Sequence, residues 1–189
     1  MILDLSEDGR FVVVSAFKVP QTMDPSATLK ELRAAVPGSE IQFLDGGRAA
    51  GKEHLEVAAI NASHAFKSGI SISRSLAMET LLYASAQRQI DAAIANIGVT
   101  QESKTVGLIA FSETEEDARV LEDRIGQIIG VELNEELLEE WSKEKARHIR
   151  ALYNISATEL EAIMMPRQEI EKAIKKAVVE RVALLSTRI

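Results

Sequence analysis

The segment from Leu76 to Ala86 constrains the fold more than any other part of the chain. Its sequence, LAMETLLYASA, has the composition of a helix and leaves almost no polar face. A helix that is apolar nearly all round is buried on most sides. No uncharged apolar stretch of the chain approaches the roughly 20 residues that a membrane-spanning helix needs. We therefore expect this helix to lie inside a protein core.

Short apolar runs indicate a small β-sheet. The best strand candidate is Phe11–Phe17, which is apolar and rich in β-branched residues. The segment His54–Ile60 alternates at Leu55, Val57 and Ala59, which is typical of a strand. The expected strands are Phe11–Phe17, Ile41–Leu44, His54–Ile60 and Thr105–Phe111.

Helix signals fill the intervals between these runs. Pro25 opens a helix, with Ser26 or Thr28 as its cap, and Pro37-Gly38 follows its end. Asn61 is placed to cap a short helix that begins at Ala62. The expected helices are Pro25–Ala35, Ala62–Lys67, Leu76–Ala86, Gln89–Asn96 and Glu115–Ile129, followed by helices from Asn134 onward.

The predicted fold class is α+β, with a small mixed sheet of about four strands covered by helices. The C-terminal third, about residues 132–189, is expected to be helical. Strands separated by helices of differing length, with a hairpin-like gap between the second and third strands, favour this arrangement over a doubly wound sheet. With 189 residues, we expect a single domain over 1–189.

Composition places the chain among ordinary globular proteins. It has no cysteine, which excludes disulfides, thiolate zinc sites and a cysteine nucleophile. The first residues are acidic at Asp4, Glu7 and Asp8, and no basic region leads into an apolar run, so no signal peptide is predicted. We expect a soluble cytoplasmic protein with no membrane partner.

The net charge of −7 argues against a general nucleic-acid binder, because neutralising phosphates requires a basic surface. The charge is unevenly distributed. The segment from Glu113 to Trp141 contains eleven acidic residues and two basic ones, Arg119 and Arg124, whereas the chain after Trp141 is net basic. Any contact with RNA must therefore be local and made by a few basic side chains.

Catalytic motifs are absent from the sequence. There is no G-x-x-x-x-G-K-[ST], G-x-G-x-x-G or G-x-S-x-G. His54, His64 and His148 are far apart and show no metal-ligand spacing, so neither a metal nor another cofactor is expected. Acidic pairs such as Glu115-Glu116 lie on polar helix faces. We expect a protein that is not an enzyme and has no small-molecule substrate.

Glu79 is the one charged residue inside the apolar helix, and a buried carboxylate is costly unless it is paired. Arg74, before the helix, and Arg88, after it, are its obvious partners; Arg88 is alternatively placed to pair with Asp91 at i, i+3. The functional alternative is an anion site. In that arrangement Arg74 and the exposed N–H groups of the helix N-terminus face a phosphate, and Lys67 approaches from the preceding helix.

Several segments together resemble one known family. They are Ala65-Phe66, the run Ser71–Ile90 that contains Arg74 and Arg88, Ile97-Gly98-Val99, Tyr153–Leu160 and Glu180–Leu185. These segments resemble the TPRKB family, which comprises the PRPK-binding protein of eukaryotes and its archaeal counterpart in the KEOPS complex. The resemblance spans nearly the whole chain and is weak before Glu53.

The resemblance implies a non-catalytic subunit of KEOPS, the assembly that makes threonylcarbamoyladenosine (t6A) in tRNA. Such a subunit binds and stimulates the atypical kinase/ATPase of the complex and captures the CCA acceptor end of tRNA. On this chain it makes Arg74 and Arg88 the candidate tRNA contacts, with Lys67, Asn61 and His64 as neighbours. The residues nominated for the kinase-binding surface are Ile97, Val99, Leu184 and Leu185.

The acidic stretch Glu132–Glu140 departs from the family pattern and suggests an elongated helix. Two further hypotheses stay open beside the tRNA-recruiting adaptor. One is a protein–protein adaptor or kinase regulator that makes no RNA contact and whose arginines only neutralise Glu79. The other is a small-molecule enzyme, which would need a pocket lined by converging polar groups.

Overall fold

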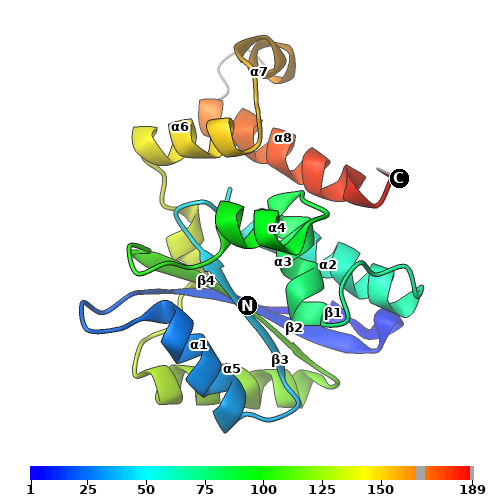
Figure 1. The fold of residues 1–189 in the computed structure, drawn as a ribbon, viewed down its shortest axis with the longest axis vertical. Helices are drawn as coiled ribbons and strands as arrows, with labels where there is room; N and C mark the ends of the chain where they lie inside the picture. The colour runs from blue at the N-terminus through cyan, green and yellow to red at the C-terminus, as the bar shows by residue number, and fades with distance from the viewer. Residues whose placement is uncertain (165–168, 188–189) are drawn as a thin grey trace.

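A four-stranded antiparallel sheet forms the centre of the computed structural model, which describes residues 1–164 and 169–187 (Figure 1). The strand order is β1-β2-β4-β3. The strands are β1 (Ile2–Leu5), β2 (Arg10–Lys18), β3 (Glu40–Asp45) and β4 (Thr105–Ser112). The α+β class, the number of strands and the helical C-terminal region are confirmed.

Helices cover both faces of the sheet. One face carries α1 (Pro25–Ala35) and α5 (Glu115–Ile129), which pack on Val13, Phe17 and Phe43. The other face carries most of the remaining helices, which pack on residues such as Val12, Val14 and Ile109. Neighbouring residues of one strand therefore enter different cores, which explains why β2 and β4 are apolar almost throughout.

The segment His54–Ile60, expected to be a strand, is instead part of α2 (Lys52–Lys67). Leu55, Ala58, Ala59 and Ala62 are all buried, and their spacing is that of one helix face. The strand prediction was wrong because Leu55, Val57 and Ala59 also alternate over this short window. The helix predicted to begin at Ala62 is the second half of α2.

All three strand pairings are antiparallel, so the sheet is not mixed as expected. The expected hairpin between the second and third predicted strands does not form, because His54–Ile60 is helical. Its place as the fourth strand is taken by β1, which pairs Ile2 with Val13 and Leu3 with Val12. The sequence pattern of β1 is short and broken by Asp4, which gave no clear strand signal.

The apolar segment forms α3 (Leu76–Ser85) and is buried as predicted. It packs mainly against α2 and α4 (Ile90–Ile97), with further contacts to β3 and α8 (Ile170–Ala183). Ala86 has a φ of 52°, a left-handed conformation that ends the helix. Arg74 and Arg88 therefore do not lie on one continuous helix.

The acidic stretch Glu132–Glu140 does not form an elongated helix. It contains only a short 3-10 helix, η2 (Glu135–Glu139), whose Leu138 is buried. The chain then continues through α6 (Lys143–Leu152), α7 (Ala157–Ile163), α8 and η3 (Leu184–Thr187), and α6 and α8 lie side by side (Figure 1). Among the described residues, no helix is long and apolar enough to cross a membrane.

Candidate functional site

The Glu79 carboxylate binds the backbone of the loop that precedes α3. It is fully buried and accepts hydrogen bonds from the N–H groups of Ile72, at 3.0 and 3.1 Å, and Ser73, at 2.7 Å. Arg74, the partner suggested by the sequence, is exposed and forms no ion pair with Glu79 in the described part of the chain. Glu79 is therefore a clamp that holds the 70–75 loop on α3.

The N-terminus of α3 is occupied by oxygens of the chain itself. The Ser75 hydroxyl accepts the N–H of Met78, and a Glu40 carboxylate oxygen accepts the N–H of Ala77 at 2.9 Å. Ser75 also donates its hydroxyl to Glu40. The Ala77 and Met78 N–H groups are thus not free to face a phosphate, as the anion-site alternative requires, because these two oxygens already accept from them. The side chain of Arg74 is exposed beside this helix end.

The three weaker tRNA-contact candidates lie on α2, on one side of the molecule. His64 and Lys67 both contact Asp8, in the turn between β1 and β2, at 2.9 and 3.3 Å. Lys67 also donates to the carbonyl of Glu7. Asn61 donates its side-chain amide to the Val57 carbonyl within α2 and does not cap a helix. The structure thus gives each of these residues an intramolecular role.

A groove brings together residues from three separate segments. It is about 270 Å³ in volume and is lined by Ile70, Ile72, Tyr83, Arg88, Leu185 and Ser186. We call this the isoleucine groove. Ile70 is 67% exposed and Ile72 36% exposed, although both are large aliphatic side chains. Burial and the nearby Glu79 carboxylate raise the pKa of Tyr83 above its ordinary value, so its hydroxyl stays protonated at neutral pH.

A second pair of exposed isoleucines follows Arg88 along the chain. Ile90 and Ile94 lie four residues apart on α4 and are 41% and 47% exposed. Residues at this spacing share one helix face. Sequence reasoning did not identify Ile70, Ile72, Ile90 or Ile94 as site residues. The sequence shows Ile70 and Ile72 alternating with Gly69, Ser71 and Ser73, which does not separate exposed isoleucines from buried ones.

The residues nominated for kinase contact have different environments. Ile97 is fully buried and Leu185 is 1% exposed, at the floor of the isoleucine groove. Val99 is partly buried and packs against the core on the α1 and α5 side of the sheet. Leu184 is 43% exposed. Of the four, Leu184 is the most exposed, and Leu185 lines the groove.

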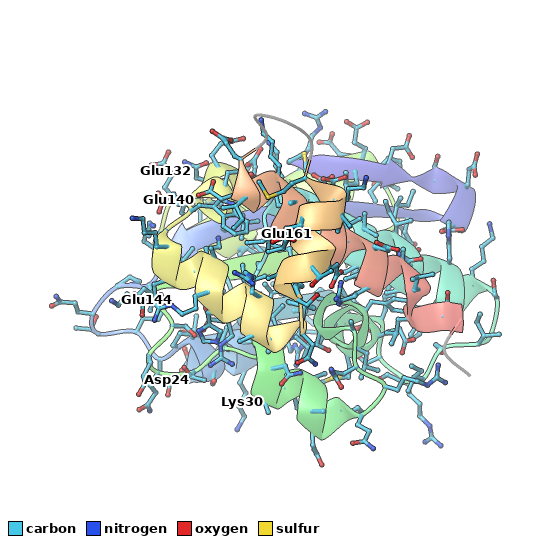
Figure 2. The ribbon with its side chains drawn as sticks, turned by 90° about the horizontal axis from the view of Figure 1, so that it is seen from above. Asp24, Lys30, Glu132, Glu140, Glu144 and Glu161 are labelled. Carbon is cyan, nitrogen blue, oxygen red and sulfur yellow. The ribbon has the colours of Figure 1, made fainter. Side chains whose placement is uncertain are left out.

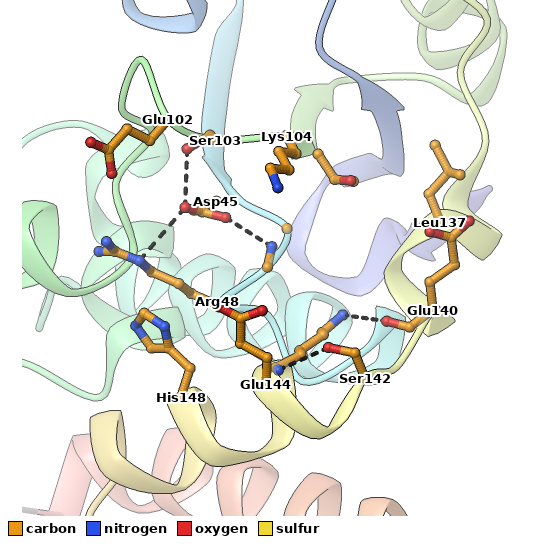
Figure 3. A pocket seen from close by; sticks show the side chains of 14 residues that line it. Asp45, Arg48, Glu102, Ser103, Lys104, Leu137, Glu140, Ser142, Glu144 and His148 are labelled. Carbon is orange, nitrogen blue, oxygen red and sulfur yellow. Dashed lines mark hydrogen bonds and ion pairs between the residues drawn. The ribbon is translucent and has the colours of Figure 1, made fainter.

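A polar pocket of about 450 Å³ lies between the β3–α2 turn and the start of α6 (Figure 3). Asp45 is at one side of it and accepts hydrogen bonds from the Ser103 hydroxyl and the Gly47 N–H, and it pairs with Arg48 at 3.6 Å. Since both carboxylate oxygens are engaged, Asp45 is poorly placed to act as a general base. These contacts hold the turn against the chain that leads into β4.

Lys145 lines the same pocket, and its ammonium donates to the carbonyls of Leu138 and Glu140. Burial lowers its pKa to about 8, against the opposing effect of Glu139. His148 also lines the pocket from α6 (Figure 3). Within the described ranges, no group of three or more acidic or histidine side chains is arranged to hold a metal ion.

Comparison with known families defines the class of protein. Residues 20–186 match a model of a family of kinase-binding proteins, which is most of the chain. The chain belongs to this family, described as Kinase binding protein CGI-121, and the resemblance to the TPRKB family is confirmed. No curated protein matches the chain.

Proposed function

We propose that this protein is the small subunit of a KEOPS complex and takes part in t6A biosynthesis in the cytoplasm. In this role it has no catalytic activity of its own. It binds and stimulates the atypical kinase/ATPase subunit and recruits tRNA through the CCA acceptor end. Membership of a kinase-binding family supports the binding of the kinase/ATPase subunit. The resemblance of the Ser71–Ile90 segment supports the recruitment of tRNA.

The single observation that carries the proposal is the exposure of aliphatic side chains at and beside the isoleucine groove. The buried Glu79 holds the backbone of Ile72, and the Ile70 N–H donates to the Ala65 carbonyl at 3.0 Å, so the surface is formed before a partner binds. Exposed aliphatic side chains arranged around a groove are typical of protein-binding surfaces. We assign the kinase-binding surface to the isoleucine groove together with Ile90 and Ile94.

Charged substitutions on this surface are expected to weaken kinase binding. Burying one isoleucine contributes roughly 1.5 to 3 kcal/mol, so Ile70→Asp and Ile94→Asp should each raise the Kd for the kinase subunit by about tenfold or more. Isothermal titration calorimetry with the kinase subunit measures this. Val120→Asp is the matched control, because Val120 is 56% exposed on α5, on the opposite face of the sheet. Equal loss in the control, or none in the two variants, would overturn the assignment.

The tRNA part of the proposal has a separate test. We expect tRNA to bind the chain, binding to fall when the CCA end is removed, and Arg74→Ala or Arg88→Glu to weaken it. Arg74→Ala should leave the stability unchanged within about 0.5 kcal/mol, because its side chain is exposed. Gel shifts at several salt concentrations measure the binding. If the parent chain binds the kinase but no tRNA, the alternative of a kinase regulator without RNA contact is correct.

A further inference from the structure

A hollow lined by two arginines lies between the end of α6 and the start of α7, where no function has been assigned. It is about 560 Å³ in volume and is lined by Arg147, Arg150, Ala151, Asn154, Ile155 and Ser156. We call it the α6–α7 hollow. Among the described residues, its lining contains two arginines, an amide and a hydroxyl, and no acidic side chain. This lining is basic, although the chain as a whole has a net charge of −7.

The two arginines occupy neighbouring positions on one side of α6. They are three residues apart, so their side chains start from the same helix face. The buried residues of α6 and the following turn, Ile149 and Tyr153, hold the helix against the core. The arginines thus project from a fixed element, and a bound anion would not have to order the backbone that carries them.

Neither guanidinium is neutralised by an ion pair within the part of the chain that the structure describes. In residues 1–164 and 169–187, neither forms an ion pair, and the Nε of Arg150 is buried without a hydrogen-bond partner. A buried N–H donor with no acceptor is costly and marks a place where an oxygen ligand would be favourable. The nearby acidic residue Glu159 is already bound by Arg181 through two hydrogen bonds, at 2.7 and 2.8 Å.

The charge of α6 also favours the binding of an anion. Four of the ten residues of α6 are basic and one is acidic: Lys143, Lys145, Arg147 and Arg150, with Glu144 in the first turn. Figure 2 looks down on α6 and α7, with Glu144 at the end of α6 that is distant from α7. Since the rest of the chain is acidic, a polyanion would be attracted to this local region and repelled from most of the surface.

We propose that the α6–α7 hollow binds a backbone phosphate of RNA, held by Arg147 and Arg150, with Asn154 and Ser156 as additional polar groups. The planar guanidinium suits two-point binding of phosphate oxygens, and phosphate contacts position an RNA without reading its sequence. This inference rests on the proposed recruitment of tRNA and adds a contact remote from Arg74. It assigns to the hollow the role of fixing the orientation of the bound RNA.

The test uses the full chain and a tRNA, with binding measured by fluorescence anisotropy over a series of salt concentrations. Each phosphate contact contributes about 0.7 to 0.9 to the slope of log affinity against log salt. The double variant R147A/R150A removes this one phosphate contact, so it should lose about 0.7 to 0.9 from this slope and on the order of tenfold in affinity at about 0.1 M salt. R147K should keep most of the slope, because the charge is retained.

The control variant K30A/R119A removes the same charge from exposed positions on α1 and α5. It should leave the slope nearly unchanged. An equal effect in both double variants would show a general charge effect and overturn the inference, and so would wild-type RNA binding by R147A/R150A. Kinase binding by R147A/R150A should equal that of the parent, which also shows that the variant is folded.

A second measurement separates RNA from free phosphate. If inorganic phosphate raises the Tm of the parent but not of R147A/R150A, while RNA binding is the same in both, the hollow is a free-phosphate site and the RNA assignment is wrong. If the parent binds no RNA at all, the tRNA part of the proposed function fails together with this inference. If the parent binds RNA and only the arginine dependence is missing, the inference alone fails.

Discussion

Glu79→Gln should lower the free energy of unfolding by about 3 kcal/mol, because a hydrogen bond to a buried charged acceptor is worth roughly 1.5 to 3 kcal/mol. Glu79 is fully buried and accepts from two backbone N–H groups, Ile72 and Ser73. A glutamine retains one carbonyl acceptor and places an NH₂ donor against these N–H groups. Urea denaturation monitored by circular dichroism measures the loss.

The same substitution should also weaken kinase binding, because Glu79 fixes the backbone of Ile72 in the isoleucine groove. Glu161→Gln is the matched control, since Glu161 is exposed on α7 and should change the stability by less than about 0.5 kcal/mol (Figure 2). The clamp would be disproved if Glu79→Gln were as mild as Glu161→Gln, or if Arg74→Ala were as damaging as Glu79→Gln.

The second large effect is a loss of stability in mild acid, caused by His54. Its ring is fully buried between α2, the end of α3 and Tyr153. Nδ1 accepts the N–H of Ala50 at 3.1 Å, so Nε2 carries the proton and donates to the Ala84 carbonyl at 2.8 Å. The Tyr153 hydroxyl donates to the same carbonyl at 2.6 Å. This arrangement requires a neutral imidazole, because a second proton on Nδ1 would face the Ala50 N–H.

Burial lowers the pKa of His54 from 6.5 to about 4, and the charge of Lys145 adds to the effect. As the pH falls below 6.5, the unfolded chain takes up this proton before the folded chain does. The contribution of His54 is therefore complete above about pH 6.5 and is lost progressively down to about pH 4. The shift corresponds to about 3 kcal/mol.

Carboxylates also titrate in this range, so the measurement is a difference between the parent and His54→Gln. At pH 7 the variant should be less stable, because it cannot reproduce both ring hydrogen bonds and the packing of the ring. We expect the difference in the free energy of unfolding to shrink toward pH 4.5, as the parent loses its His54 contribution. A difference that stays constant between pH 7 and 4.5 would contradict a neutral buried His54.

The strongest sequence patterns predicted their structures correctly. Phe11–Phe17, Ile41–Leu44 and Thr105–Phe111 lie within β2, β3 and β4, and Leu76–Ala86 becomes the buried helix α3. These runs are apolar over most of their length, so their burial does not depend on whether a helical or a strand spacing is assumed. His54–Ile60 was assigned wrongly because its apolar residues fit both a strand spacing and a helical one, and the contacts of α2 with α3 and α8 decide for the helix.

The candidate site was harder to predict from the sequence than the fold. The burial of Glu79 could be predicted from its apolar neighbours, but its partners are backbone N–H groups whose positions depend on the folded loop. The α6–α7 hollow depends on a turn at Asn154, which has a φ of 51°, and this turn brings Ser156 near Arg147 and Arg150. Exposure of Ile70, Ile72, Ile90 and Ile94 is likewise a property of packing, and no local pattern distinguishes them from core residues.

The most direct test of the proposed kinase-binding surface is amide hydrogen exchange of the chain with and without the kinase subunit. We expect slower exchange on binding in residues 70–75, in α4 and in residues 184–187, with no change in α5. Protection that falls on α5 and the sheet face beneath it, while the isoleucine groove continues to exchange as in the free chain, would contradict the assignment.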